Sequence, residues 1–182
     1  MELIIESFPK LLHATKLTIE LTLLSLFFGI FVGIFFALLR ISKSKILYFI
    51  SYYYSYVFRG TPLLVQIFII YFGLAQIEWV RESFLWILLK EPYACAILAF
   101  TLNTGAYSSE IFRSAFETIN KGVVEAATGL GLNKVNIFFK VKLPIAIKQS
   151  LPAYGNEMIL MLKGTSLAST VTLLDLTGVA KH

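Results

Sequence analysis

The chain has 182 residues, of which 57% are hydrophobic and 15% are charged, and its formal net charge is +5. About a quarter of the residues of an ordinary soluble domain are charged, so this composition, with a mean hydropathy of +0.76, predicts an integral membrane protein of one domain. The basic residues lie between apolar stretches, where membrane topology explains them, and no basic-aromatic cluster indicates a nucleic-acid partner.

The first forty residues divide into an amphipathic and an apolar part. Residues 1–20 mix leucine and isoleucine with charged side chains, which is typical of a segment lying at the membrane interface. Residues 21–39 carry no charge and are about long enough to cross the bilayer as a helix. Gly29 and Gly33 lie four apart within this span, a spacing that lets another helix approach closely, although it also arises by chance.

The second apolar stretch, residues 46–77, is interrupted by the sequence Phe58-Arg59-Gly60-Thr61-Pro62. Proline lacks an amide hydrogen and glycine relaxes the backbone, so the helix is expected to kink or break at residues 59–62. Such a break at membrane depth persists only where it is buried in protein or lines a cavity. An arginine there is costly unless it is paired or hydrated, which makes Arg59 a functional candidate. Alternatively, Arg59 lies at the cytoplasmic interface and the span begins after it.

The remaining chain predicts two further spans and a polar loop. Residues 78–91 are a short polar link, and residues 92–109 are an uncharged third span that carries polar side chains near its end. The loop 110–148 and residues 40–45 hold the basic excess, which places both in the cytoplasm and the N-terminus outside. Residues 149–174 form an irregular fourth span, since Pro152, Asn156 and Glu157 interrupt it. Part of this span must face protein or water.

Patterns that carry catalysis or bind metals are missing from the sequence. There is no phosphate-binding Gly-x4-Gly-Lys-Ser/Thr loop and no Gly-x-Ser-x-Gly elbow. No cysteine–histidine cluster has metal-ligand spacing, and the carboxylates Glu110, Glu117 and Glu157 form no evident acid–base pair. The sequence therefore predicts a protein that is not an enzyme, has no ATPase site of its own, and holds no metal or cofactor.

The cytoplasmic loop carries the strongest local signal, Glu-Ala-Ala-Thr-Gly-Leu-Gly ending at Gly131. Residues 123–127 are good helix formers, and Gly129 and Gly131 can turn the chain after them. Asn133 can cap a second helix that stops at Pro144. Two short helices joined by a tight turn would fit a groove on a partner protein. The alternative is an ordinary amphipathic loop that lies on the membrane surface.

Short sequence motifs along nearly the whole chain match those of one protein family. In order they are Thr22-Leu-x-Ser25 with Gly29, Gly33 and Ala37-Leu-x-Arg40; Phe58-Arg-Gly-Thr-Pro-Leu-Leu-Val-Gln66 and Tyr71-Phe-Gly73; Gly105-Ala-Tyr-x-Ser-Glu-Ile-Phe-Arg113; Lys121-Gly-x3-Ala126-Ala127 with Gly131; Leu143-Pro144; and Asn156-Glu157 before Lys163-x-Thr165-Ser-Leu167. Together they resemble the polar amino-acid subfamily of bacterial ABC importer permeases.

The resemblance implies an all-α, polytopic type I ABC importer transmembrane domain over residues 21–182, in the bacterial inner membrane. Its implied partners are an ABC ATPase subunit, an extracytoplasmic amino-acid-binding protein, a second permease subunit that is identical or related, membrane lipid, and a polar or charged amino acid as substrate. The residues it assigns to ATPase coupling are Gly122, Glu125, Ala126, Ala127, Gly131, Leu143 and Pro144. Coupling would proceed by alternating access around a site near the membrane midplane.

Polar residues within the spans are candidate substrate contacts. Arg59 could pair with the carboxylate of an amino acid, and Glu157 could bind its ammonium group or a basic side chain. The candidates are Arg59, Gly60, Thr61, Pro62, Gln66, Asn103, Tyr107, Asn156, Glu157, Lys163, Thr165 and Ser166. Alternatively, Glu157 pairs structurally with Lys163, or Asn156 and Glu157 merely join helices.

Two features depart from the family pattern. Gly164 stands where the family usually has an acidic or other polar residue, and the chain stops at His182, where family members continue into one more membrane helix. We therefore expect about four membrane helices here, in a shortened gene product or a fragment. The rival functions are a truncated permease that transports nothing and, with less support, a stand-alone secondary transporter or channel.

Overall fold

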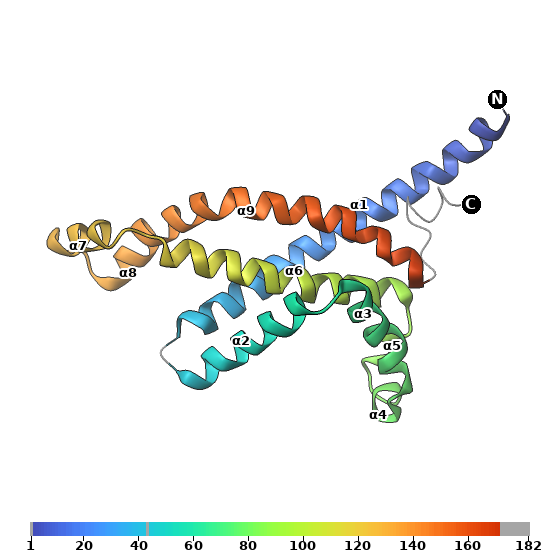
Figure 1. Cartoon of the computed structure of the whole chain (residues 1–182), viewed down its shortest axis with the longest axis horizontal. Helices are drawn as coiled ribbons and strands as arrows, with labels where there is room; N and C mark the ends of the chain where they lie inside the picture. The colour runs from blue at the N-terminus through green and yellow to red at the C-terminus, as the bar shows by residue number, and fades with distance from the viewer. Residues whose placement is uncertain (1, 43, 172–182) are drawn as a thin grey trace.

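The computed structural model describes residues 2–42 and 44–171, and every regular element in this part of the chain is helical (Figure 1). The α-helices are α1 (Glu2–Ile41), α2 (Lys45–Gly60), α3 (Leu63–Phe68), α4 (Glu78–Arg81), α5 (Trp86–Leu89), α6 (Pro92–Glu117), α7 (Lys121–Gly129), α8 (Lys134–Ile137) and α9 (Leu143–Gly164). Short π or 3-10 turns cover Ile69–Gly73, Leu74–Gln76, Phe138–Lys142 and Thr165–Val171. The predicted all-α fold is confirmed.

Helix α6 is the centre of the molecule. It packs against α1, α2, α3 and α9, and Figure 1 shows α7 and α8 at one end of this bundle and α4 and α5 at the other. Its small and polar residues are buried, and Phe100 is fully enclosed. The stretch that carries Asn103, Thr104 and Tyr107 therefore lies in protein rather than against lipid, which is the environment that polar side chains in a membrane require.

The close contact between α1 and α6 depends on glycines. A Cβ atom added at Gly33 would lie 2.6 Å from the Cβ of Ser108, and one added at Gly29 would lie 2.6 Å from Cγ2 of Thr104. On the α6 side, a Cβ at Gly105 would lie 2.6 Å from Cγ1 of Val32. The close approach predicted from the spacing of the two α1 glycines is confirmed.

The predicted break in the second apolar stretch is present. Helix α2 ends at Gly60, and α3 begins after Pro62, whose backbone is extended. The helical segments on the two sides of the break are bent by 106°. The physical cause is the one expected from the sequence, since proline disfavours helix at the preceding residue and cannot donate to it.

Helix α1 is continuous from Glu2, so the predicted interfacial segment and the first predicted span share one helix. Two features of the last helix differ from the sequence prediction. The expected stop at Pro144 is wrong, because this proline lies in the first turn of α9, where its missing amide hydrogen costs nothing. Pro152 lies inside α9 without interrupting it. The end of the predicted fourth span, residues 172–174, and the chain end at His182 lie outside the described residues.

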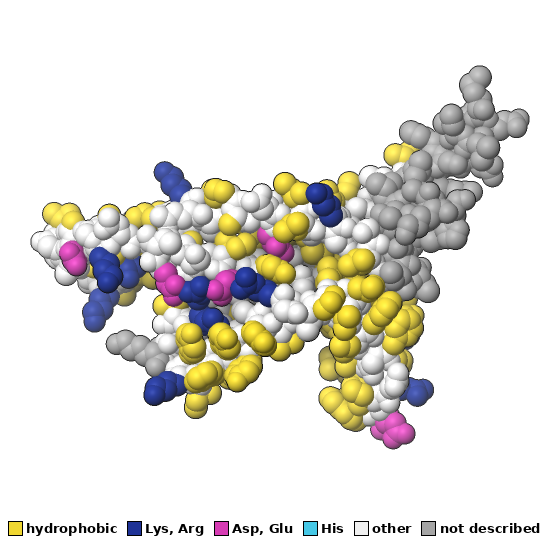
Figure 2. Space-filling model, viewed as in Figure 1, with side chains coloured by type: hydrophobic (Ala, Val, Ile, Leu, Met, Phe, Trp, Pro, Cys, Tyr) yellow, Lys and Arg dark blue, Asp and Glu magenta, His cyan; other side chains and the backbone are white. Residues whose placement is uncertain are grey.

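By length and composition, one described helix is able to cross a membrane alone, namely Ala14–Ile41 within α1, with a mean hydropathy of 2.5. Lys45–Gly60 and Leu63–Gln76 together qualify as a second, broken span. On the face shown in Figure 2, hydrophobic side chains gather over α2 and over the segment from α3 to α5, while charged side chains lie in the groove between α2 and α6. Helix α2 also exposes tyrosines, among them Tyr52 and Tyr56.

Candidate functional site

The break after α2 leaves backbone carbonyls without their helical partners, and two buried amides satisfy them. The Gln66 amide nitrogen donates to the carbonyl oxygens of Phe58 at 2.8 Å and Thr61 at 3.0 Å. Asn103, on α6, donates to the same Phe58 carbonyl at 3.0 Å and to the Gln66 side-chain oxygen at 3.1 Å. These two predicted path residues therefore hold the break in place against α6.

Replacing Gln66 by leucine is expected to loosen this break. The change removes the hydrogen bonds from Gln66 to the carbonyls of Phe58 and Thr61, which at about 0.5–1.5 kcal/mol each contribute about 1–3 kcal/mol together. For a chain of this size, that corresponds to a fall of about 2–12 °C in the melting temperature measured in detergent. Gln76→Leu is the matched control, because Gln76 is exposed. Equal melting temperatures for the two variants would contradict the role given to Gln66.

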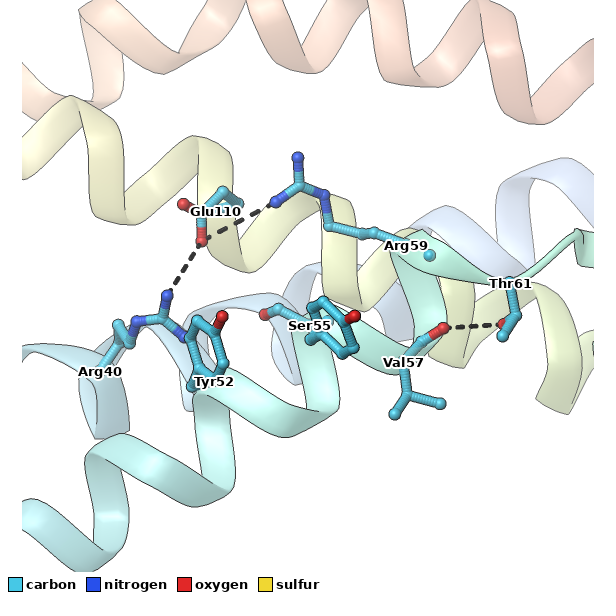
Figure 3. A pocket seen from close by; sticks show the side chains of 9 residues that line it. Arg40, Tyr52, Ser55, Val57, Arg59, Thr61 and Glu110 are labelled. Atoms are coloured by element: carbon cyan, nitrogen blue, oxygen red, sulfur yellow. Dashed lines mark hydrogen bonds and ion pairs between the residues drawn. The ribbon is translucent and has the colours of Figure 1, made fainter.

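Arg59 lies in the last turn of α2, beside a charged cluster that joins three helices (Figure 3). Its Nη1 lies 4.0 Å from Oε2 of Glu110 on α6, and Nη2 of Arg40 on α1 lies 4.0 Å from the same oxygen. Arg113 donates to the other oxygen, Oε1, from Nε at 2.9 Å and from Nη2, and also pairs with Glu117. One carboxylate thus meets three guanidinium groups.

Glu110 follows the predicted third span, and its surroundings keep it ionised. Burial raises the pKa of its carboxyl, but the hydrogen bonds and charge of Arg113 and the charges of Arg40 and Arg59 lower it further. Its pKa therefore lies below the ordinary value for a glutamate. The Arg59 guanidinium also stands 5.4 Å from the centre of the Tyr107 ring, a distance suited to a cation–π contact.

Two cavities border this cluster. The first has a volume of about 640 Å³ and lies along α2, where Tyr52, Gly60 and Thr61 line it together with Arg59 and Glu110 (Figure 3). The second, of about 440 Å³, lies between α6 and α9 and is lined by Tyr107, Gln149 and Ala153 as well as Arg59 and Glu110. Both are large enough for a single amino acid.

Glu157 is buried in α9, with 5% of its surface exposed. Its Oε1 accepts a hydrogen bond of 3.0 Å from Thr104 Oγ1 on α6. Within the described chain, no lysine or arginine nitrogen lies within 4.0 Å of this carboxylate, so the suggested structural pair with Lys163 is not formed.

The other predicted path residues fall into two groups. Asn156 and Lys163 are exposed on α9, away from the buried face that carries Glu157. Thr165 is buried but donates to the Leu162 carbonyl at 2.7 Å, and Ser166 donates to the Lys163 carbonyl at 2.8 Å. Both hydroxyls therefore bind carbonyls in the last turn of α9. Pro62 is exposed at the break.

The Glu-Ala-Ala loop forms two short helices with capped starts. The Asn120 side chain accepts from the Gly122 amide at 2.8 Å at the start of α7, and the Asn133 side chain accepts from the Asn136 amide at 2.8 Å at the start of α8. Between them, Gly131 has a φ of 77°, the left-handed conformation that ends many helices. The turn predicted at this glycine and the cap predicted at Asn133 are confirmed.

The surface of this loop is partly apolar. Leu130 is 83% exposed at its tip, Glu125 and Ala126 are exposed, and Ala127 is buried. The other two residues assigned to coupling, Leu143 and Pro144, begin α9, so they lie where the loop returns to the bundle. The loop projects from the end of the bundle in Figure 1.

Sequence reasoning missed part of the site. Arg40, Thr104 and the role of Glu110 emerge only from the structure, because their partners lie on other helices. Sequence reasoning predicted no acid–base pair at Glu110 and did not identify its ion pairs with arginines. The spacing of Glu110, Arg113 and Glu117 at three and four residues on a helix does signal mutual pairing. Nothing local in the sequence connects Arg40 to Glu110.

The sequence is similar to those of known membrane transport proteins. Residues 29–180 match the family described as binding-protein-dependent transport system inner membrane component. The chain is 50% identical over 183 residues to the nopaline transport system permease protein NocM of Agrobacterium fabrum, covering 100% of this chain and 76% of that protein. It is 39% identical over 166 residues to the histidine/lysine/arginine/ornithine transport system permease protein HisM of Escherichia coli, covering 91% and 70%.

A solved structure shows the same arrangement. The crystal structure of an amino acid ABC transporter with histidines superimposes with a TM-score of 0.86 at 34% sequence identity, covering 98% of this chain and 79% of that one. The inward-facing MetNI methionine ABC transporter has a TM-score of 0.67 at 20% identity, covering 88% and 74%, and therefore shows a shared fold.

Proposed function

The chain belongs to the family of binding-protein-dependent transport system inner membrane components. We propose how this subunit selects and moves its substrate. It is a permease subunit of an ATP-driven amino-acid importer, a system that includes an ATPase and a binding protein. The proposal is that this subunit carries amino acids with a basic side chain through a path formed by α2, α6 and α9. Residues 21–182 would act as one transmembrane domain.

The observation that carries this proposal is the buried carboxylate of Glu157, which accepts a hydrogen bond from Thr104 but forms no ion pair within the described chain. A buried charge without a counter-charge is costly, and a cationic ligand would relieve that cost. Arg59 supplies a positive charge at the break, where it lines a cavity together with Gly60 and Thr61. An amino acid placed between the two would direct its carboxylate to Arg59 and its basic side chain to Glu157. The permease named for histidine, lysine, arginine and ornithine transport fits this chemistry.

Glu157→Gln tests the assignment, because glutamine keeps the shape and removes the charge. Truncating one member of a buried charge pair costs about 2–5 kcal/mol, so the half-saturating concentration of arginine should rise at least about thirtyfold. Uptake of radiolabelled L-arginine into proteoliposomes that contain the complete transporter measures this. Lys163→Gln, an exposed change on the same helix, should leave arginine uptake unaltered. An unchanged arginine affinity in Glu157→Gln would remove Glu157 from the site.

We further propose that the loop from Lys121 to Lys142 seats in the ATPase. The exposed Leu130 and Ala126 would enter a groove on the ATPase, and closure of the ATPase dimer would then rock the helices between two access states. This assignment places the loop in the cytoplasm and the N-terminus outside, with a second permease subunit, identical or related, completing the path. Uptake that needs ATP inside the vesicles supports it. Uptake driven by an ion gradient without any ATPase would favour a stand-alone secondary transporter.

A further inference from the structure

The two cavities beside the charged cluster meet at one ion pair. Among the residues that line them, Arg59 and Glu110 are common to both. The pair reaches from the last turn of α2 to α6, and Figure 3 shows the Arg59 side chain extending from α2 toward Glu110. The pair therefore stands at the border between the cavity along α2 and the cavity between α6 and α9.

The two partners of this ion pair are held unequally. Glu110 is fixed through Oε1, which accepts two hydrogen bonds from Arg113 on its own helix. Arg59 lies 4.0 Å from Oε2, beyond hydrogen-bond distance, and its side chain is 41% exposed. Arg59 also immediately precedes Gly60, where an added Cβ would meet nothing within 4 Å. Arg59 is therefore the less tightly held partner of the pair.

We propose that the Arg59–Glu110 pair is a gate in the translocation path, opened when the carboxylate of the arriving amino acid takes Arg59 from Glu110. This rests on the proposed function. A free carboxylate competes well for Arg59, because Glu110 already shares its charge with Arg40 and Arg113. When Arg59 leaves, Glu110 still has Arg40 and Arg113 as partners, so opening the gate leaves no buried charge without a counter-charge. Glu110 is thus a positioning residue that sets when the path is continuous, without touching the substrate.

The test is ATP hydrolysis by the complete transporter in proteoliposomes, with and without binding protein loaded with L-arginine. If substrate works by releasing Arg59, Glu110→Gln should raise hydrolysis in the absence of arginine about two- to fivefold, as expected from loss of a partly exposed ion pair. Stimulation by arginine should shrink by the same factor. Arg59→Gln should raise substrate-free hydrolysis equally, and the double variant should add nothing further, because both changes break one contact.

Glu117→Gln is the matched control, since Glu117 also pairs with Arg113 but lines neither cavity. Glu110→Asp keeps the charge and should fall between wild type and Glu110→Gln. The gate is excluded if Glu110→Gln, or Glu110→Asp where the glutamine variant does not assemble, hydrolyses ATP like the Glu117→Gln transporter. If instead the proposed function is wrong, the wild-type complex should show neither arginine uptake nor stimulation of ATP hydrolysis by arginine.

Discussion

Gly131→Ala is expected to reduce recovery of the ATPase with the membrane-extracted chain about five- to thirtyfold, whereas Gly129→Ala should leave it unchanged. Both changes add one methyl group to the loop, and at both positions that methyl meets nothing within 4 Å. The difference lies in the backbone. Gly131 has a φ of 77°, which costs a side-chain-bearing residue about 1–2 kcal/mol, while Gly129 ends a regular helix. This conformational cost determines the expected loss in the recovery of the ATPase.

The backbone conformation of Gly131 determines the direction in which the chain leaves α7. The left-handed residue allows the Leu132 amide to reach the Ala127 carbonyl at 3.2 Å and the Gly131 amide to reach the Thr128 carbonyl at 3.0 Å. A residue that resists this conformation would redirect Leu130, the exposed apolar tip, and misalign it with its groove. Co-purification from membranes, with insertion of each variant checked by extraction, measures the effect. Equal recovery with both alanine variants would show that the loop does not dock through this turn.

This loop was predictable because its signals are local. Asparagine caps, a helix-forming run and a glycine that ends it act over a few residues, and the chain folds there as the sequence indicates. The break at Thr61 and Pro62 was predictable for the same reason. Pro144 shows the limit of such reasoning, since proline ends one helix and begins another equally well. The position of the neighbouring turn decides between the two.

The site was less predictable, because its residues depend on neighbours from other helices. Gln66 and Asn103 were expected to contact substrate as neutral partners, yet their amides bind the freed carbonyls of the break. Glu110 acquires its role from Arg40 and Arg59, which lie 70 and 51 positions earlier in the sequence. A burial pattern can place a polar residue inside a bundle. It does not say which of several polar partners it meets there.

Gly29→Ala is expected to weaken both the fold and arginine uptake, whereas Gly33→Ala should weaken the fold alone. Each added methyl would press into α6 at 2.6 Å, and overpacking of this kind costs about 1–3 kcal/mol. The melting temperature in detergent should therefore fall by about 2–12 °C in both variants. Between helices in lipid, close packing supplies much of the attraction, since lipid tails are as apolar as leucine.

The two variants differ in what they displace. The methyl at position 29 meets Thr104, whose hydroxyl donates to Glu157, while the methyl at position 33 meets Ser108, for which the structure shows no hydrogen-bond partner. A shift of Thr104 alters the setting of the proposed cation-binding carboxylate, so the half-saturating arginine concentration should rise only for Gly29→Ala. Gly155→Ala, where an added Cβ meets nothing within 4 Å, should change neither measurement. If Gly29→Ala and Gly33→Ala lower the melting temperature yet leave arginine affinity equal, α1 supports the bundle without setting the substrate site.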